Sequence, residues 1–177
     1  VAKELQGYIS KLEKIRVPVI AAIHGGCIGG AVDLVTACDI RLASSDSFFC
    51  IQEINIGMAA DVGTLQRLPK IIPDSKMREM AYTGRRMYAP ESKETGLVSD
   101  VYESQEAMLS AANDLAKEIA SKSPVAIYGL KAVMNYSRDH SVSDGLDYNA
   151  LWSGAMLSQK DMTCLLYTSP SPRDKSS

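Results

Sequence analysis

Hydrophobic residues recur at helical spacing at the start of the chain and then form short unbroken runs. Leu5, Ile9, Leu12 and Ile15 alternate with Lys, Glu and other polar residues. This spacing places the four apolar side chains on one face of a helix. It predicts an amphipathic helix that ends before Pro18, because the residue before a proline disfavours helical geometry.

The first unbroken apolar run, residues 19–24, lies between a proline and a Gly-Gly pair, which is typical of a strand buried on both faces. Residues 25–30 then predict a tight connection. The same criteria predict further strands at 39–43, 48–52 and 97–101 and short helices at 30–37, 61–68, 74–83 and 90–95. Gly84 and Gly96 follow the last two of these helices, where glycine commonly ends a helix.

From residue 105 onward the pattern is helical, at 105–121, 124–136 and 142–158. The chain therefore predicts an α/β segment followed by a helical region. The stretch from Cys164 to Asp174 breaks the pattern, and a disordered Ser/Pro tail would explain it. A common sequencing adapter, read in one frame, encodes the same peptide. We expect residues 164–177 to be non-native, and the natural start to precede Val1, because the chain has no initiator Met.

Composition excludes several classes of function. The 177 residues are 46% hydrophobic and 23% charged, with a net charge of -2. These values are ordinary for a globular protein and argue against nucleic acid or an anionic membrane surface as the main partner. The longest apolar stretch, residues 17–23, is too short to cross a bilayer. The four cysteines lack Cys-x-x-Cys spacing, which predicts reduced, partly buried thiols rather than a zinc site or a disulfide framework.

Three carboxylates, Asp33, Glu53 and Asp61, interrupt apolar stretches that are punctuated by glycine. Buried carboxylates rarely lack a partner or a task, and burial raises the pKa of a carboxylate, which makes it a usable proton carrier near neutral pH. Gly29 and Gly30 precede a predicted helix, where backbone N–H groups can meet a developing negative charge. The combination predicts proton transfer on a substrate that becomes an oxyanion.

Each of these features also has a structural interpretation. The Gly-Gly pair at 29–30 can be a plain strand-to-helix turn. Asp33 can complement the dipole of the helix it begins, and Asp61 can be an ordinary N-cap. Glu53 is harder to explain in this way, because it interrupts the end of an apolar strand. The functional interpretation is favoured by the occurrence of all three acids beside the glycines.

Residues 18–41, Pro-Val-Ile-Ala-Ala-Ile-His-Gly-Gly-Cys-Ile-Gly-Gly-Ala-Val-Asp-Leu-Val-Thr-Ala-Cys-Asp-Ile-Arg, resemble the signature of the crotonase (enoyl-CoA hydratase/isomerase) superfamily. Two further segments, 62–69 and 136–142, resemble the delta(3,5)-delta(2,4)-dienoyl-CoA isomerase branch of it. Hydratases of the superfamily typically carry glutamate at the positions of Asp33 and Glu53 but a small residue near Asp61. The third acid therefore favours the isomerase.

The resemblance implies an α/β fold built as a crotonase-like spiral of ββα turns. Residues 1–103 would be the C-terminal part of that spiral, with its first turns upstream of Val1. Residues 104–163 would be a helical region that covers the acyl site and helps to form a homotrimer or a dimer of trimers. The same resemblance implies a mitochondrial matrix or peroxisomal location.

The resemblance also implies a reaction, the conversion of 3,5-dienoyl-CoA to 2,4-dienoyl-CoA in fatty-acid β-oxidation. The thioester oxygen of an acyl-CoA would bind at the Gly29-Gly30 turn, on the Gly30 N–H and a second donor upstream of this chain. Glu53 would remove the proton next to the thioester carbonyl, Asp61 would deliver one at the far end of the diene, and Asp33 would tune this pair or hold a water. No metal or redox cofactor would be needed, because the thioester stabilises the dienolate. A 2-enoyl-CoA hydratase and a non-catalytic acyl-CoA-binding scaffold remain alternatives.

Overall fold

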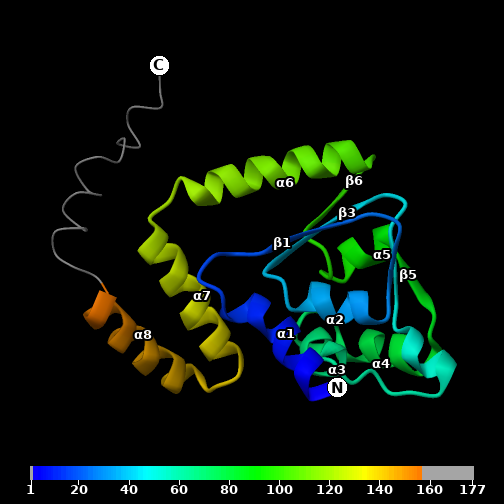
Figure 1. Cartoon of the computed structure of the whole chain (residues 1–177), viewed down its shortest axis with the longest axis horizontal. Helices are drawn as coiled ribbons and strands as arrows, with labels where there is room; N and C mark the ends of the chain where they lie inside the picture. The colour runs from blue at the N-terminus through cyan, green and yellow to red at the C-terminus, as the bar shows by residue number, and fades with distance from the viewer. Residues whose placement is uncertain (1, 157–177) are drawn as a thin grey trace. The chain divides into compact units, whose positions relative to one another are not determined.

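The computed structural model describes residues 2–156, and helices alternate with short strands over the first two thirds of it (Figure 1). The helices are α1 (Ala2–Lys14), α2 (Gly30–Thr36), α3 (Thr64–Arg67), α4 (Asp74–Thr83), α5 (Ala89–Glu94), α6 (Gln105–Ala120), α7 (Pro124–Arg138) and α8 (Val142–Met156), with 3₁₀ helices η1 (Gln52–Ile56) and η2 (Leu68–Lys70). The strands are β1 (Ile20–Ile23), β2 (Gly26–Ile28), β3 (Ile40–Ser44), β4 (Phe48–Cys50), β5 (Arg86–Tyr88) and β6 (Asp100–Tyr102).

The strands form two small sheets. One is parallel throughout, in the order β1-β3-β6, with Ile20 opposite Ile40. The other has the order β2-β4-β5, with β2 parallel and β5 antiparallel to β4. The sequence pattern did not predict β2, β5 or η1. Both unpredicted strands have three residues and pair with residues far along the chain, so no local alternation could indicate them.

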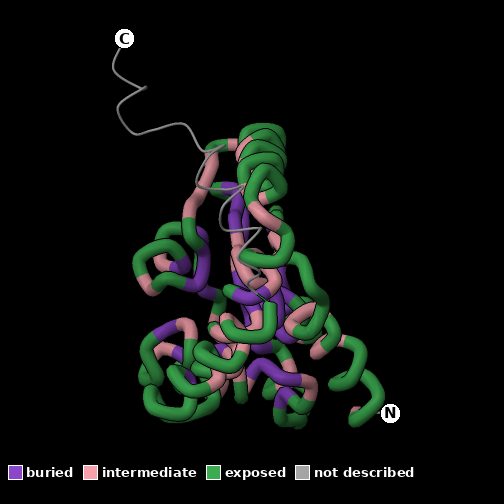
Figure 2. The backbone as a smooth tube through the Cα atoms, turned by 90° about the vertical axis from the view of Figure 1, so that its left-hand side faces the viewer, coloured by how far each residue is buried: buried purple, intermediate pink, exposed green. Residues whose placement is uncertain are grey.

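The hydrophobic core lies where these sheets meet the short helices around them. Its largest fully buried side chains include Phe49, Leu68, Met80, Met87 and Leu97. Figure 2 shows this buried backbone in purple along the interior strands, with exposed helices around it. The core therefore holds β4, which precedes Glu53, through Phe49, and it holds the segment that follows Asp61 through Leu68 of η2.

Local signals set several helix ends, and the sequence predicts the one at Gly84. Gly84 adopts a φ of 63° after α4 and donates its N–H to the carbonyl of Met80 at 2.9 Å. A residue with a β-carbon is strained at such a φ, which explains the glycine. At the start of α6, the hydroxyl of Ser104 accepts the N–H of Ala107 at 3.1 Å, an ordinary N-cap.

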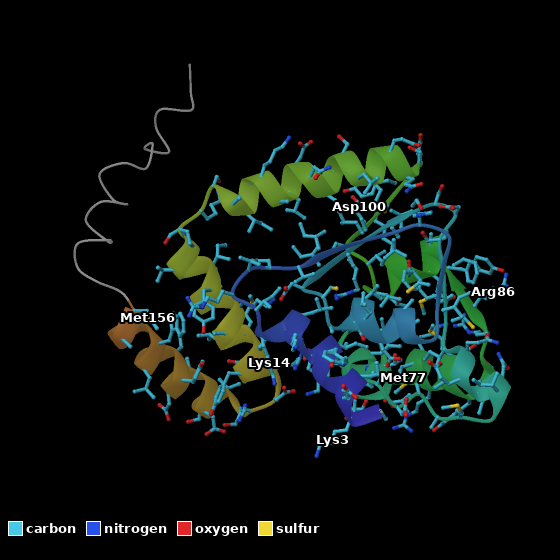
Figure 3. All side chains as sticks on the ribbon, viewed as in Figure 1. Lys3, Lys14, Met77, Arg86, Asp100 and Met156 are labelled. Carbon is cyan, nitrogen blue, oxygen red and sulfur yellow. The ribbon has the colours of Figure 1, made fainter. Side chains whose placement is uncertain are left out.

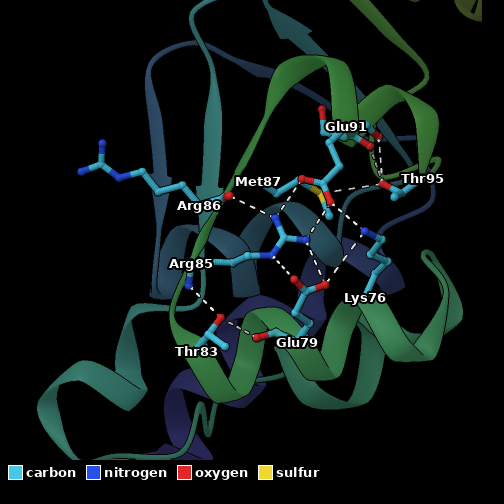
Figure 4. A network of polar contacts seen from close by, with 9 residues as sticks. Lys76, Glu79, Thr83, Arg85, Arg86, Met87, Glu91 and Thr95 are labelled. Atoms are coloured by element: carbon cyan, nitrogen blue, oxygen red, sulfur yellow. Dashed lines mark hydrogen bonds and ion pairs between the residues drawn. The ribbon is translucent and has the colours of Figure 1, made fainter.

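An ion-pair network joins α4, β5 and α5 (Figure 4). Arg85 donates to both carboxylate oxygens of Glu91, at 2.8 and 2.7 Å, and its Nε lies 3.0 Å from Oε1 of Glu79. The Nζ of Lys76 lies 3.3 Å from Glu91. The Arg85 guanidinium holds the pKa of Glu91 below its ordinary value. This network stabilises the outer edge of the second sheet.

The chain divides into two compact units at Ile127 and Tyr128, so that the described residues fall into 2–127 and 128–156. In the second unit, Tyr136 stacks on His140 and Tyr148, with centroid distances of 3.7 and 4.2 Å. A β-carbon on Gly129 would lie 2.1 Å from the indole nitrogen of Trp152, so glycine permits the close approach of α7 and α8. The predicted boundary at 103/104 stays a prediction. The predicted tail, 164–177, lies outside the described residues, as do the last two residues of the helix predicted at 142–158.

Three of the four cysteines, Cys27, Cys38 and Cys50, are buried and are not joined to one another by disulfides, and Cys164 lies outside the described residues. Burial raises the pKa of Cys27 to about 12. Among residues 2–156 no helix is long and apolar enough to cross a bilayer.

Candidate active site

The Gly29-Gly30 turn connects β2 to α2 with a backbone that favours glycine. Gly29 has a φ of 56° and a ψ of -121°, a conformation that residues with a β-carbon rarely adopt. Its N–H donates to the carbonyl of Cys50 at 2.9 Å, which fixes the turn against β4. Gly30 begins α2, so its N–H has no acceptor within the helix. A β-carbon on Gly30 would meet nothing within 4 Å, so the space beside this residue is open.

Glu53 lies beside this turn. Parallel pairing of β2 with β4 places Ile28 opposite Cys50, and η1 follows immediately after β4. A β-carbon on Gly29 would lie 3.3 Å from Oε1 of Glu53, so the glycine leaves room for the carboxylate. The other carboxylate oxygen, Oε2, is buried and has no hydrogen-bond partner within the described residues. A buried acceptor without a partner is destabilising, so this oxygen is available to a ligand.

Asp33 is buried in the first turn of α2, with 1% of its surface exposed. Its Oδ1 accepts the backbone N–H of Thr64 at 2.6 Å. This N–H lies at the start of α3, where no intrahelical acceptor exists. Asp33 thus joins α2 to α3 and satisfies the helix end that the structural interpretation gave to Asp61.

The interpretation of Asp61 as an N-cap is wrong. Helix α3 begins at Thr64 rather than at 61, its N-cap is Gly63, and no side chain of its own segment caps it. The side chain of Asp61 is exposed, and its backbone carbonyl accepts the amide of Gln6 at 2.6 Å. An aspartate before a predicted helix suggested the cap. The acceptor of the Thr64 N–H is instead Asp33, 31 positions upstream, and no local sequence pattern reveals a contact over that distance.

The structure thus brings together some of the predicted site residues and not others. Glu53 meets the Gly29 turn, and Asp33 meets the segment that follows Asp61. Over residues 2–156, no hydrogen bond joins Asp61 to Glu53 or to Asp33. The catalytic roles of these residues stay predictions. Within the same range, no group of three His, Cys, Asp or Glu side chains forms a set of metal ligands.

Sequence reasoning missed the polar side chains that hold the backbone around Asp61. Arg67 of α3 donates to the carbonyl of Val62, and Gln6 of α1 donates to Asp61. The contact between Gln6 and Asp61 spans 55 positions, so the hydrophobic periodicity of the sequence cannot predict it. The only available signal was an arginine four residues after Gly63, which is too common to single out.

Comparisons with known proteins support the family resemblance that the sequence motifs indicate. The sequence model of the family described as enoyl-CoA hydratase/isomerase matches residues 1–168. The chain is 53% identical over 167 residues to the mitochondrial delta(3,5)-delta(2,4)-dienoyl-CoA isomerase of Mus musculus, covering 94% of this chain and 51% of that protein. It is 49% identical over 160 residues to the peroxisomal protein of the same name from Arabidopsis thaliana, covering 90% and 58%. The chain therefore spans about half the length of the curated relatives it matches.

Among solved structures, an enoyl-CoA hydratase from Bacillus anthracis superimposes with a TM-score of 0.87 at 30% sequence identity. The match covers 93% of this chain and 64% of that one. The predicted crotonase-like α/β fold is thereby confirmed.

Proposed function

Since the chain belongs to the enoyl-CoA hydratase/isomerase family, we propose that its protein converts 3,5-dienoyl-CoA to 2,4-dienoyl-CoA. The observation that carries this proposal is the buried, unpartnered Oε2 of Glu53 beside the Gly29-Gly30 turn. A carboxylate and an open helix N-terminus side by side suit a substrate that loses a proton next to a carbonyl and becomes an oxyanion.

The reaction uses the groups at this turn in sequence. The thioester oxygen accepts the N–H of Gly30 and a second donor from a segment upstream of this chain. Glu53 takes a proton from the carbon next to the thioester carbonyl, and the electron pair of that C–H bond spreads over the dienolate. Negative charge on the oxygen is stabilised by the two donors, each of which contributes roughly 10²–10³ in rate.

Asp61 completes the reaction at the other end of the diene. It donates a proton to the far carbon, so both double bonds move one position toward the thioester. Glu53 is left protonated and Asp61 ionised, and exchange with solvent restores both. Asp33 tunes this pair or holds a water, and through Thr64 it fixes the backbone that follows Asp61. The thioester itself stabilises the intermediate, so the reaction needs no metal or redox cofactor.

We also propose that the protein assembles as a homotrimer or a dimer of trimers. Support comes from large apolar side chains that stay exposed on α7 and α8, among them Leu130, Met134, Leu146 and Leu151. Exposed apolar clusters of this kind commonly mark protein interfaces. The names of the relatives from mouse and Arabidopsis favour the mitochondrion or the peroxisome as its location.

The test is a substrate comparison with the intact protein, extended upstream to the length of its curated relatives. Conjugation of the diene with the thioester changes the ultraviolet spectrum, so isomerisation can be followed directly. The proposal expects turnover of 3,5-dienoyl-CoA. Hydration of 2-enoyl-CoA without isomerisation would establish the hydratase, and acyl-CoA binding without turnover would establish a scaffold.

The Asp61→Asn variant tests the residue that separates the isomerase from the hydratase. Asparagine keeps the shape of the side chain but has no transferable proton, and loss of a general acid typically costs about 10²–10⁴ in rate. The melting temperature should not change, because the side chain is exposed and caps no helix. An unchanged isomerase rate would remove Asp61 from the mechanism.

A further inference from the structure

The segment that carries Asp61, residues 61–63, has no regular structure before α3 begins and is held by side chains from other elements. We refer to it as the Asp61 loop. Gln6 donates its side-chain amide to the carbonyl of Asp61 at 2.6 Å, and Arg67 donates from Nη1 to the carbonyl of Val62 at 3.4 Å. Two consecutive carbonyls are thus fixed by two different helices.

Arg67 also lies directly over the next residue of this loop. Gly63 has a φ of 138°, and a β-carbon there would lie 1.8 Å from Nη1 of Arg67. Glycine at this position therefore lets the guanidinium approach the backbone closely. The other terminal nitrogen, Nη2, donates to the hydroxyl of Ser10 at 2.8 Å and to Oε2 of Glu13 at 3.1 Å.

The Arg67–Glu13 pair is largely shielded from solvent, with 12% and 15% of the two side chains exposed. It anchors Arg67 to α1, the helix that also carries Gln6. None of the residues of α1 is fully buried, although Ile9 and Leu12 are half-buried. In Figure 3 the helix runs between the labelled Lys3 and Lys14. Polar side chains of α1 reach the Asp61 loop directly, from Gln6, and through Arg67, from Ser10 and Glu13.

We propose that Arg67 and Gln6 are positioning residues that hold the Asp61 loop, and hence the Asp61 carboxylate, in place for proton delivery. This inference rests on the proposed function, because it concerns the same acid. A proton donor must lie within hydrogen-bonding distance of its carbon at the moment of transfer, and a displacement of about 1 Å can cost roughly 10²-fold in rate. An exposed side chain on an irregular segment reaches that precision only if its backbone is fixed.

The experiment replaces Arg67 with lysine in the intact protein. Lysine keeps the charge near Glu13, but a single ammonium on a flexible stem cannot also lie over Gly63 and contact Val62 and Ser10. The variant should lose about 10-fold or more in kcat with KM unchanged, since only the placement of the proton donor is affected. Arg78→Lys is the matched control. Arg78 is exposed on α4, pairs with Asp74 there, and should tolerate the change without loss of kcat.

A double-variant cycle separates positioning from a general structural role. Once Asp61→Asn has removed the proton donor, Arg67→Lys should cause no further loss of kcat, because both changes affect the same step. If Arg67 only supports the fold, the two losses should multiply. Losses that multiply, or an Arg67→Lys variant with unchanged kcat, would overturn the inference.

Gln6→Ala provides a second, independent variant if Arg67→Lys destabilises the fold. The side chain of Gln6 is exposed, so its removal should leave the melting temperature nearly unchanged while kcat falls. Unchanged kcat in this variant would then decide against positioning from α1. The wild-type and Asp61→Asn rates report separately on the proposed function: if the wild type does not isomerise, or Asp61→Asn is as fast, the proposed function itself fails.

Discussion

Replacing Gly29 with alanine should lower both the stability and the turnover of the protein, by two separate effects. The first effect is backbone strain. Gly29 has a φ of 56° and a ψ of -121°, and a residue with a β-carbon in so sparsely populated a region costs about 1–3 kcal/mol. For a chain of this size, each kcal/mol corresponds to roughly 2–4 °C in melting temperature.

The second effect is steric and acts on Glu53. The new β-carbon would lie 3.3 Å from Oε1 of the carboxylate and 3.9 Å from Cβ of Gln52. The first distance is shorter than an ordinary van der Waals contact, so the carboxylate must move by a few tenths of an ångström. If Glu53 is the base, a displacement of this size should cost about 10-fold in kcat, since about 1 Å costs roughly 10²-fold.

Gly25→Ala is the control that separates the two effects. Gly25 also has a positive φ, 62°, but a β-carbon there meets nothing within 4 Å. This variant should lose stability through strain and keep its kcat. Thermal melting and the ultraviolet isomerase assay on both variants provide the comparison. If Gly29→Ala retains the kcat of Gly25→Ala, crowding of Glu53 has no catalytic consequence, and the assignment of Glu53 as the base loses its geometric support.

Three further expectations concern other parts of the molecule. Asp33→Ala should cost about 1–3 kcal/mol in a denaturant titration, because it leaves the buried N–H of Thr64 unpaired, whereas Asp33→Asn keeps an acceptor and should cost less. The Arg85 guanidinium lowers the pKa of Glu91, so this pair stabilises the fold above the ordinary carboxylate pKa, and its contribution is lost as the pH falls through the lowered pKa. The Arg85→Met variant should therefore lose less stability than the wild type as the pH is lowered through this range. A stability–pH profile identical to that of the wild type would contradict this. Because burial raises the pKa of Cys27 to about 12, mass spectrometry after iodoacetamide treatment at pH 8 should find this thiol unmodified in the native protein and modified after denaturation.

Much of the fold could be predicted from local pattern. Helix α4 ends where the sequence indicates, because Gly84 takes the positive φ that ends it, while its N-cap is Pro73. The long helices α6 and α7 follow from their apolar periodicity and from Ser104 and Pro124 at their starts. Features made by pairing between distant residues could not be predicted in this way. Strand β2 lies inside a glycine-rich connection and exists only because β4 pairs with it.

The candidate site also contains some features that the sequence could predict and others that it could not. The residue types of Gly29 and Glu53 indicated their proximity correctly, because an acid at the end of an apolar strand beside a glycine turn has few structural explanations. The alternative interpretation of Asp61 as an N-cap was wrong, since the N–H of Thr64 is satisfied from α2 instead. Which side chain satisfies a helix end can depend on contacts between helices, and these contacts form only in the packed structure.

The central claim is that two carboxylates exchange protons at opposite ends of one diene. It is tested most directly by a single-turnover isomerisation of 3,5-dienoyl-CoA by the intact protein in ²H₂O, followed by mass spectrometry and NMR of the product. Because the acid that delivers the proton is not the base that removes one, and its exposed carboxyl exchanges with solvent, the account predicts deuterium at the far end of the former diene. In Asp61→Asn this labelled product should form far more slowly. A 2,4-dienoyl product whose far carbon carries no deuterium, having received instead the proton removed next to the thioester, would contradict the account. A hydrated product would contradict it as well.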